Sequence, residues 1–279
     1  MVLIYLLILV LFVTIGVITT KQFRATARKN LTGKWGKAVV LTLGYFVVTL
    51  LLGIISGLFA EESALSALLN LAVSILNIPL SYGILSSFFK LYNNENVGAF
   101  DFLSTAFSNF GRAWAISLRV FLKLLLPIVL YIVGISFMVG NIVLTTTSSI
   151  TGESFAFGPI FSLLGLILII VSVIWLMIRS YTYEMAGYIA IDSPELTTKE
   201  AVERSKAIMP GNRAKYFWLS CSFIGWAFLA IFTLGIGLLW VIPYMQISSI
   251  AFYYFVAGKA ENNVSVEETT NTVEPSSET

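Results

Sequence analysis

The chain has 279 residues, of which 57% are hydrophobic and only 11% are charged, and its formal net charge is +2. A soluble domain normally carries about a quarter charged residues, so a water-facing surface over this length is excluded and lipid is the simplest environment for the apolar residues. Histidine is absent and Cys221 is the single cysteine, which removes the commonest general base, a histidine metal site and an internal disulfide.

Seven apolar runs are long enough to cross a bilayer, because about 20 residues at about 1.5 Å each span a core of about 30 Å. They cover residues 2–19, 38–60, 65–89, 120–145, 158–178, 217–234 and 238–257. The predicted fold class is therefore all-α, a polytopic transmembrane helix bundle of about seven spans.

The two ends of the chain differ from this membrane domain, which we place at residues 21–258. The first run has no charged start and no small-residue cleavage site, so we interpret residues 1–20 as an N-terminal anchor helix and not as a signal peptide. Residues 259–279 are polar and acidic, and they predict a disordered tail. Residues 217–257 fit either two short spans or one span followed by a re-entrant segment.

The positive charges fall on one side of the predicted membrane. Sixteen of the 17 Lys and Arg residues lie in segments 20–37, 90–119, 179–216 and 258–279, whereas the loops on the opposite side carry only Glu61, Glu62 and Glu153. Because Lys and Arg in short loops stay on the cytoplasmic side, we predict an outside N-terminus and a cytoplasmic C-terminus.

Three of the cytoplasmic segments share a pattern, in which an amphipathic stretch ends at a glycine and leads through basic and aromatic residues into a span. They cover residues 23–37, 100–114 and 198–217. In the second, Leu103, Phe107, Phe110 and Trp114 share one helical face, as in a helix that lies in the membrane interface. The pattern predicts a threefold repeat of interfacial helix and hairpin. The alternative is that basic and aromatic residues collect at any inner interface.

The third segment also carries signals for the two ends of a helix. Thr197 and Glu200 form a capping box, and Met209-Pro210-Gly211 ends the helix.

Polar groups inside apolar spans are the main candidates for a functional site. Glu184 is the foremost of them, with Arg179 or Arg213 as its predicted partner. We expect the uncharged polar residues of the spans to make helix–helix hydrogen bonds; they include Asn70, Asn77, Asn141 and Gln246.

The residues lack the patterns of an enzyme, a cofactor site, a metal site or a nucleic-acid interface. Topology accounts for the basic loops, which also suit anionic lipid headgroups at about 1 kcal/mol per charge. The predicted partners are therefore the lipid bilayer, anionic headgroups at its inner face and another membrane protein.

Several motifs of the last third resemble one known family. They are Asp192-Ser193-Pro194, Met209-Pro210-Gly211, Ser222-Phe223-Ile224-Gly225-Trp226, Thr233-Leu234-Gly235-Ile236-Gly237 and Pro243-Tyr244. This pattern resembles the uncharacterised bacterial membrane family named domain of unknown function nine-seven-five, and the likeness covers residues 24–257. The helix before this region, Pro210, and the lack of a central Pro-Gly pair depart from the family pattern. The resemblance implies a bacterial inner-membrane protein, and it implies no activity.

Together, the polar candidates and the motifs single out eight positions. They are Glu184, Gly211, Arg213, Trp226, Gly235, Gly237, Pro243 and Tyr244.

Two functions fit the sequence. The first is a non-enzymatic accessory, scaffold or protective component of the membrane, which the lack of catalytic groups favours. The alternative is a permease or exporter for a small hydrophobic or peptide-like solute, which the proline- and glycine-broken spans favour. The alternative requires a cavity lined by Asn77, Gln246 or Ser248.

Overall fold

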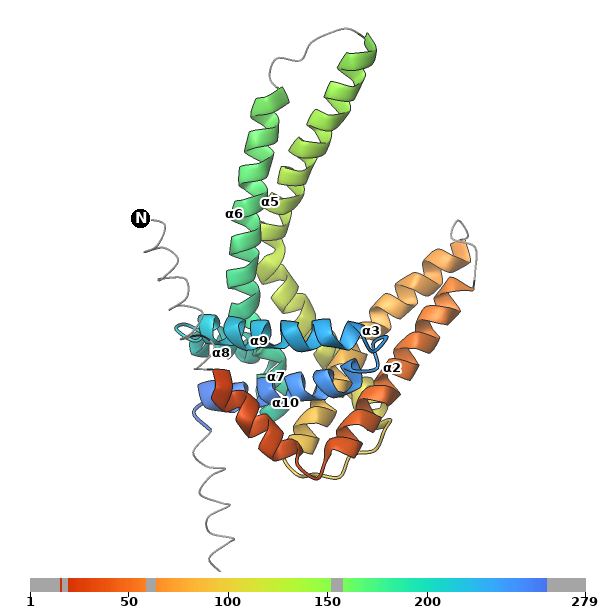
Figure 1. Ribbon diagram of the computed structural model, residues 1–279, viewed down its shortest axis with the longest axis vertical. Coiled ribbons are helices and arrows are strands. Elements are labelled where there is room, and N and C mark those ends of the chain that lie inside the picture. Colours follow the sequence, from red (N-terminus) through yellow and green to blue (C-terminus); the bar gives the residue numbers. More distant parts are fainter. Residues whose placement is uncertain (1–15, 17–19, 59–63, 152–157, 260–279) are drawn as a thin grey trace, which may run out of the picture.

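The computed structural model describes residues 16, 20–58, 64–151 and 158–259, and this part of the chain is built from helices joined by short turns (Figure 1). The prediction of an all-α fold is confirmed. The predicted anchor over residues 1–20 falls almost wholly outside the described residues, as does the predicted tail beyond Lys259.

Six of the described helices are long and apolar enough to cross a membrane, which indicates a membrane protein. They are α2 (Trp35–Gly57), α3 (Ala64–Tyr92), α5 (Phe110–Thr151), α6 (Gly158–Tyr183), α9 (Arg213–Ile231) and α10 (Leu238–Val256). A helix over residues 20–31 and three short helices complete the described fold: α4 (Asp101–Ser108), α7 (Ala186–Asp192) and α8 (Thr198–Ile208).

The long helices follow the predicted spans to within a few residues, with α5 as the exception. The sequence predicts a span over 120–145 after a separate interfacial helix, but the structure has one continuous helix of 42 residues. At about 1.5 Å per residue its length is about 63 Å, roughly twice the thickness of a bilayer core. Pro127 lies inside α5 and does not end it, because surrounding groups satisfy the freed backbone carbonyl in such helices.

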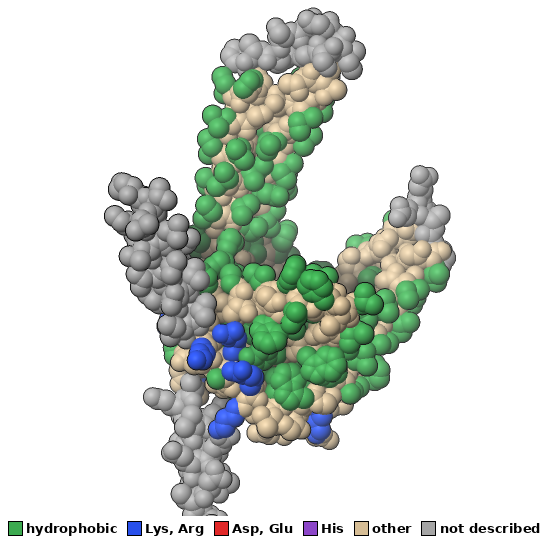
Figure 2. Space-filling model, viewed as in Figure 1, with side chains coloured by type: hydrophobic (Ala, Val, Ile, Leu, Met, Phe, Trp, Pro, Cys, Tyr) green, Lys and Arg blue, Asp and Glu red, His purple; other side chains and the backbone are tan. Residues whose placement is uncertain are grey.

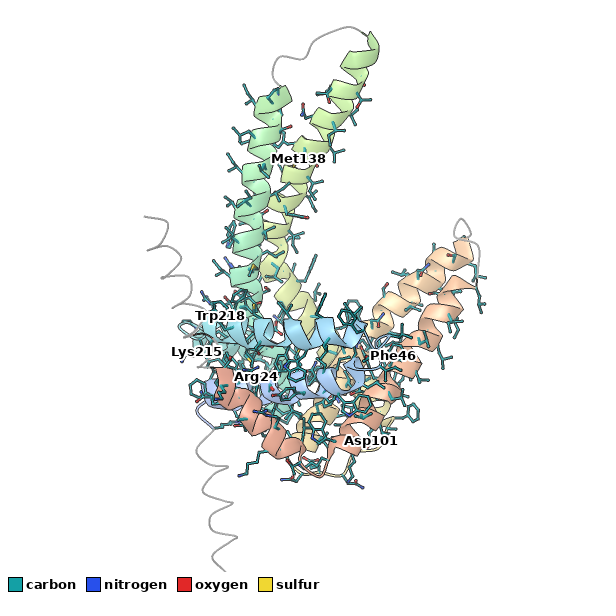
Figure 3. The ribbon with its side chains drawn as sticks, in the orientation of Figure 1. Arg24, Phe46, Asp101, Met138, Lys215 and Trp218 are labelled. Atoms are coloured by element: carbon teal, nitrogen blue, oxygen red, sulfur yellow. The ribbon has the colours of Figure 1, made fainter. Side chains whose placement is uncertain are left out.

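Two hairpins diverge from a shared base. Figure 1 shows α5–α6 and α2–α3 rising from the same side of this base and diverging, while α9 and α10 run across the base. We call this shared base the hub; it comprises residues 20–31, α4, α7, α8, α9, α10 and the adjoining ends of α2, α3, α5 and α6. In Figure 3, Met138 lies on the α5–α6 hairpin, whereas Arg24 and Lys215 lie on the hub.

The α5–α6 hairpin is held together along its length. A Cβ atom at Gly165 would lie 2.8 Å from the Gly134 carbonyl oxygen, so the missing side chains let the two backbones approach closely. Beyond this point Phe137 stacks on Phe161 with ring centroids 5.8 Å apart. The Asn141 amide donates a hydrogen bond to Ser162 on α6, which confirms its predicted helix–helix role.

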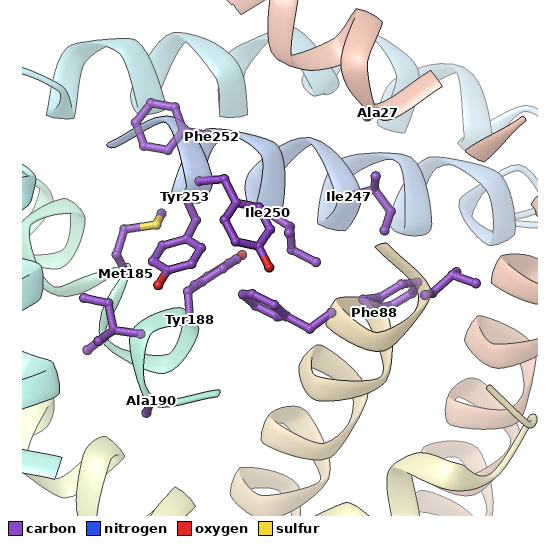
Figure 4. Close-up of a cluster of buried hydrophobic side chains, with 14 of the residues drawn as sticks. Ala27, Phe88, Met185, Tyr188, Ala190, Ile247, Ile250, Phe252 and Tyr253 are labelled. Carbon is purple, nitrogen blue, oxygen red and sulfur yellow. The ribbon is translucent and has the colours of Figure 1, made fainter. Parts of the chain in front are cut away.

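The hub holds the hydrophobic core, in which aromatic side chains pack among aliphatic ones. Phe89 of α3, Tyr188 of α7 and Tyr253 of α10 pack together there, with ring centroids 5.8–6.0 Å apart, and Figure 4 shows Tyr188 beside Tyr253. Phe252 packs edge-on against Phe23 at 5.2 Å between ring centroids, which ties α10 to the helix over 20–31. Half of the α10 span is buried (50%), against 11–22% of the other spans, so α10 is the central helix of the hub.

Glycines let α4 lie directly on the first hairpin. A Cβ atom at Gly83 of α3 would lie 2.2 Å from the Phe102 carbonyl oxygen, which leaves no room for a side chain. The buried face of α4 is therefore Phe102 and Ala106, and Phe107 is 60% exposed. The prediction that Leu103, Phe107, Phe110 and Trp114 share one face of a single helix is wrong, because the chain breaks at Asn109 and starts α5 at Phe110.

The order of elements repeats three times, but their orientation does not. A short helix precedes a hairpin at residues 20–31 with α2–α3, at α4 with α5–α6 and at α8 with α9–α10. The first two hairpins extend out from the hub, whereas α9 and α10 belong to the hub and run across it (Figure 1). The threefold repeat of interfacial helix and hairpin stays a prediction.

The sequence signals for the two ends of α8 act as predicted. The capping box of α8 forms, since Glu200 N–H donates to Thr197 Oγ1 and Thr197 N–H donates to the Glu200 carboxylate. Gly211, at φ 79°, follows the end of α8. Residues 217–257 lie in two separate helices of 19 residues each, joined by a turn in which Leu234 and Gly235 have positive φ.

Candidate functional site

Two neighbouring cavities open in the hub, and Glu184 borders both. The larger has a volume of about 580 Å³ and lies between α3, α5 and the α6–α7 junction. The smaller has a volume of about 110 Å³ and lies between α7, α9 and α10. Glu184, Tyr188 and Gln246 line both cavities. The larger volume falls in the range of about 300–1,000 Å³ that is typical of small-molecule sites.

The two cavities differ in chemistry. The larger is walled mainly by apolar side chains of α3 and α5, with hydroxyl groups spaced among them; its lining includes Ile78, Tyr82, Ile116, Ser117, Phe121 and Leu124. The smaller is more polar and aromatic for its size; its lining includes Tyr216, Ser220, Phe223, Met245 and Ser249. An apolar chamber thus adjoins a small polar one.

A break between two helices places Glu184 at the junction of the cavities. Helix α6 ends at Tyr183 and α7 begins at Ala186, and the intervening turn directs Glu184 away from the core. Tyr183 and Met185 are 3% and 0% exposed, whereas Glu184 keeps an exposed surface. That surface faces the cavities, which both touch it.

Tyr216 is the hydrogen-bond partner of Glu184. Its hydroxyl lies 3.4 Å from Glu184 Oε1 and 3.3 Å from Ser249 Oγ. A tyrosine hydroxyl carries one proton, so it can donate to only one of these oxygens at a time. Tyr216 therefore links Glu184 of the α6–α7 turn to Ser249 of α10.

Glu184 has no cationic neighbour among the described residues. Their ion pairs join Lys123 and Lys206 to Glu203, and Lys259 to Asp192. Arg179, one predicted partner of Glu184, instead lies over the Trp175 ring at 5.9 Å and donates to the Tyr183 hydroxyl.

Arg112 anchors α7 from the side of α5. Its guanidinium donates to the carbonyl oxygens of Ala190, Ser193 and Leu196 at 2.9–3.4 Å. These carbonyls lie at and after the C-terminus of α7, where a helix presents unpaired acceptors and partial negative charge.

Asp192 ties the same end of α7 to α10. Its carboxylate accepts hydrogen bonds from Tyr253 at 2.7 Å and from Tyr254 at 3.4 Å, and it pairs with Lys259. Because α7 carries Tyr188 and follows Glu184 directly, these contacts and those of Arg112 fix the shared wall of the cavities.

Of the eight positions singled out from the sequence, Glu184 alone lines the two cavities. Tyr244 stands behind the smaller one, where its ring packs edge-on against Phe223 at 5.2 Å and its hydroxyl donates to the Arg24 carbonyl. Pro243 is buried in α10, whereas Trp226 is 50% exposed on α9.

The other four positions shape turns and helix ends. Gly211 and Gly235 have φ of 79° and 85°, values that glycine adopts without strain. Arg213 is the first residue of α9, and the Gly237 N–H donates to Thr233 Oγ1 at 2.8 Å.

The sequence pointed to Gln246 as a cavity residue but did not single out Tyr188, Tyr216 or Ser117. Asn77 and Ser248, the other two residues expected to line a cavity, do not line either one. Groups of three or more His, Cys, Asp or Glu side chains that could hold a metal ion are absent from the part of the chain that the structure describes.

A family model described as "Protein of unknown function (DUF975)" matches residues 17–260. The chain belongs to the DUF975 family. The match confirms the resemblance seen in the motifs, and it spans the hub, both cavities and all six apolar helices of this DUF975 protein. Neither a curated protein nor a solved structure matches the chain.

Proposed function

We propose that this DUF975 protein is a multi-pass bacterial membrane protein that binds a small amphipathic solute in its hub, as the binding step of a permease. The observation that supports this proposal is the cavity of about 580 Å³ with Gln246 and Glu184 in its wall. A solidly packed hub would have left the permease hypothesis without a place for a solute. The role we propose is non-enzymatic.

The side chains that line the two cavities determine which kind of ligand fits. Apolar side chains of α3 and α5 supply most of the larger cavity, with a few hydroxyl groups among them, and the carboxylate of Glu184 and the amide of Gln246 lie in the wall shared with the smaller one. A ligand with an apolar body and one polar end matches this division, because each part then meets groups of its own kind.

Photo-crosslinking on the purified full-length protein in lipid nanodiscs tests the binding step. The probe is an aryl alcohol that carries a diazirine, and mass spectrometry locates the labelled peptides. We expect labels in residues 78–85 and 113–124. The variant Ser117→Phe fills the cavity and should abolish this labelling, whereas Ser136→Phe should preserve it, since Ser136 lies on the same helix away from the cavity.

Uniform labelling of the lipid-facing apolar surfaces, or labelling that survives Ser117→Phe, would show that the probe merely partitions into the bilayer. The proposed binding step would then be discarded.

We propose that the hub lies on the cytoplasmic side and that the tips of the first two hairpins lie outside. Both tips point away from the hub in Figure 1, and on the face shown in Figure 2 the Lys and Arg side chains gather on the hub. Positive charge favours the cytoplasmic side and anionic headgroups there. In a Cys221→Ser background, a membrane-impermeant thiol reagent should label Glu153→Cys but not Lys199→Cys in whole cells, and the reverse result contradicts this orientation.

An accessory or scaffold role is the second candidate, and one observation favours it. The two diverging hairpins present apolar side chains along their lengths (Figure 2), and α5 is far longer than a bilayer core requires. A photoreactive residue at Leu68, which is 63% exposed on α3, should then crosslink to one defined membrane protein in cells. Crosslinks to lipid alone would leave this role without support.

A further inference from the structure

We propose that the two cavities form one site for a ligand that carries a single positive charge, such as a protonated primary amine on an apolar body, with Glu184 binding the cationic end. This inference rests on the proposed function and names the class of its solute. It is carried by the charge, the hydrogen-bonding groups and the sizes of the two cavities.

The charge balance of the site is incomplete. Among the described residues that line the two cavities, Glu184 carries the only acidic group, and none is Lys or Arg. Within the described residues no cation pairs with it, and its hydrogen bond comes from the neutral hydroxyl of Tyr216. The exposed surface of Glu184 faces the two cavities, so a ligand that enters them is the group that can supply the missing positive charge.

The groups around Glu184 suit an ammonium head. An ammonium has three N–H donors, and the smaller cavity offers it oxygen acceptors on Glu184, Ser249 and Gln246. The aromatic rings of Tyr188, Tyr216 and Phe223 line the same cavity, and aromatic faces attract cations. A negatively charged ligand would meet Glu184 without any compensating cation.

The sizes of the two cavities indicate where the charged head and the apolar body of the ligand bind. The smaller cavity, about 110 Å³, takes the charged head, and the larger, about 580 Å³, takes the apolar body between α3 and α5. Because Glu184, Tyr188 and Gln246 belong to both linings, a single ligand can reach across the shared wall.

Three matched probes test this inference: 4-phenylbutylamine, 4-phenylbutan-1-ol and 4-phenylbutyrate, which share a body and differ in charge. Binding is measured by isothermal titration of the full-length protein in zwitterionic lipid nanodiscs, with empty nanodiscs subtracted. We expect the amine to bind at least tenfold more tightly than the alcohol, and the acid to bind most weakly.

The variant Glu184→Gln keeps the shape of the side chain and removes its charge. It should weaken amine binding at least tenfold and leave alcohol binding within twofold. The control Glu203→Gln removes a carboxylate that pairs with Lys123 and Lys206 outside both cavities, so it should leave amine binding unchanged.

The outcomes distinguish the two proposals. If the alcohol or the acid binds the wild-type protein as tightly as the amine, the preference for a cation is overturned and the solute-binding function stands. If none of the three probes binds, both are overturned. The probe comparison needs only the wild-type protein, so it decides the matter even where Glu184→Gln fails to fold. Amine binding that survives Glu184→Gln in a folded variant also overturns the assignment.

Discussion

Tyr253 of α10 donates a hydrogen bond of 2.7 Å to the Asp192 carboxylate at the end of α7. Tyr253 is only 2% exposed, and the contact joins two residues of different helices that are 61 positions apart in the sequence. It holds the helix that carries Tyr188 against the central helix of the hub. The shared wall of the two cavities therefore depends on a contact that lies outside them.

Tyr253→Phe should destabilise the hub. The change removes one hydrogen bond to a charged acceptor, which is worth about 1.5–3 kcal/mol, so we expect a clear fall in the thermal unfolding midpoint in detergent. Tyr131→Phe is the matched control, because Tyr131 is 37% exposed on α5 and surface changes cost within about 0.5 kcal/mol. Equal midpoints for the two variants would mean that the Tyr253–Asp192 contact does not stabilise the fold.

The sequence predicted the helices well and the cavities poorly, for physical reasons. An apolar run of about 20 residues reports a span directly, and a capping box reports a helix start, so α8 and most long helices followed from local patterns. The cavity wall depends on tertiary packing that brings together Tyr82, Ser117 and Gln246, which come from three separate helices. Tyr82 and Ser117 are unremarkable within their own helices, whereas Gln246 stood out as a polar group in an apolar span and Glu184 as a charge.

The sequence also did not predict that the third hairpin, α9–α10, runs across the hub. Apolar runs at residues 217–234 and 238–257 show that the helices are apolar, but they do not show the direction in which the helices run. That direction follows from packing, since α10 buries half of its span (50%) against the other helices of the hub. Its buried aromatic residues, Phe252 among them, contact the helix over 20–31.

Gly83→Ala should loosen α4 from the first hairpin. The added methyl group would lie 2.2 Å from the Phe102 carbonyl oxygen. Because this oxygen belongs to the backbone, it cannot move aside as a flexible side chain can. We expect the free energy of unfolding to fall by about 1–3 kcal/mol or more. Gly53→Ala provides the contrast: it meets nothing within 4 Å on α2, and alanine favours a helix by about 0.5–1 kcal/mol. Thermal unfolding of both variants checks the prediction, which would be wrong if Gly83→Ala were as stable as Gly53→Ala.

Arg112→Lys should destabilise the end of α7 although it keeps the positive charge. One guanidinium nitrogen, Nη2, lies within hydrogen-bonding distance of three carbonyl oxygens, and the compact, strongly hydrated ammonium of lysine does not reproduce the guanidinium at that point. We expect a loss of about 1.5–3 kcal/mol, together with faster amide hydrogen exchange over residues 186–196. Arg119→Lys is the control, because Arg119 makes one exposed contact, to Thr198 Oγ1; an equally large effect there would show that the carbonyl contacts of Arg112 are unimportant.

The capping box of α8 should make stability depend on pH in a defined direction. Hydrogen bonds from the Thr197 hydroxyl and N–H lower the pKa of Glu200, so the folded state holds this carboxylate ionised to lower pH than the unfolded state, whose glutamate pKa is about 4.3. The contribution is therefore fully present above about pH 4.3 and is lost as the pH falls through the lower folded value.

Glu200→Gln isolates this effect, because the amide oxygen still accepts a hydrogen bond but does not titrate. The difference in unfolding midpoint between wild type and Glu200→Gln should be constant near neutral pH and shrink toward zero below about pH 4.3. In a Thr197→Ala background the hydroxyl that donates to Glu200 is gone, so the same difference should change less with pH. A difference that grows as the pH falls has the opposite sign, and it would mean that the Thr197 contacts do not favour the ionised carboxylate in the folded protein.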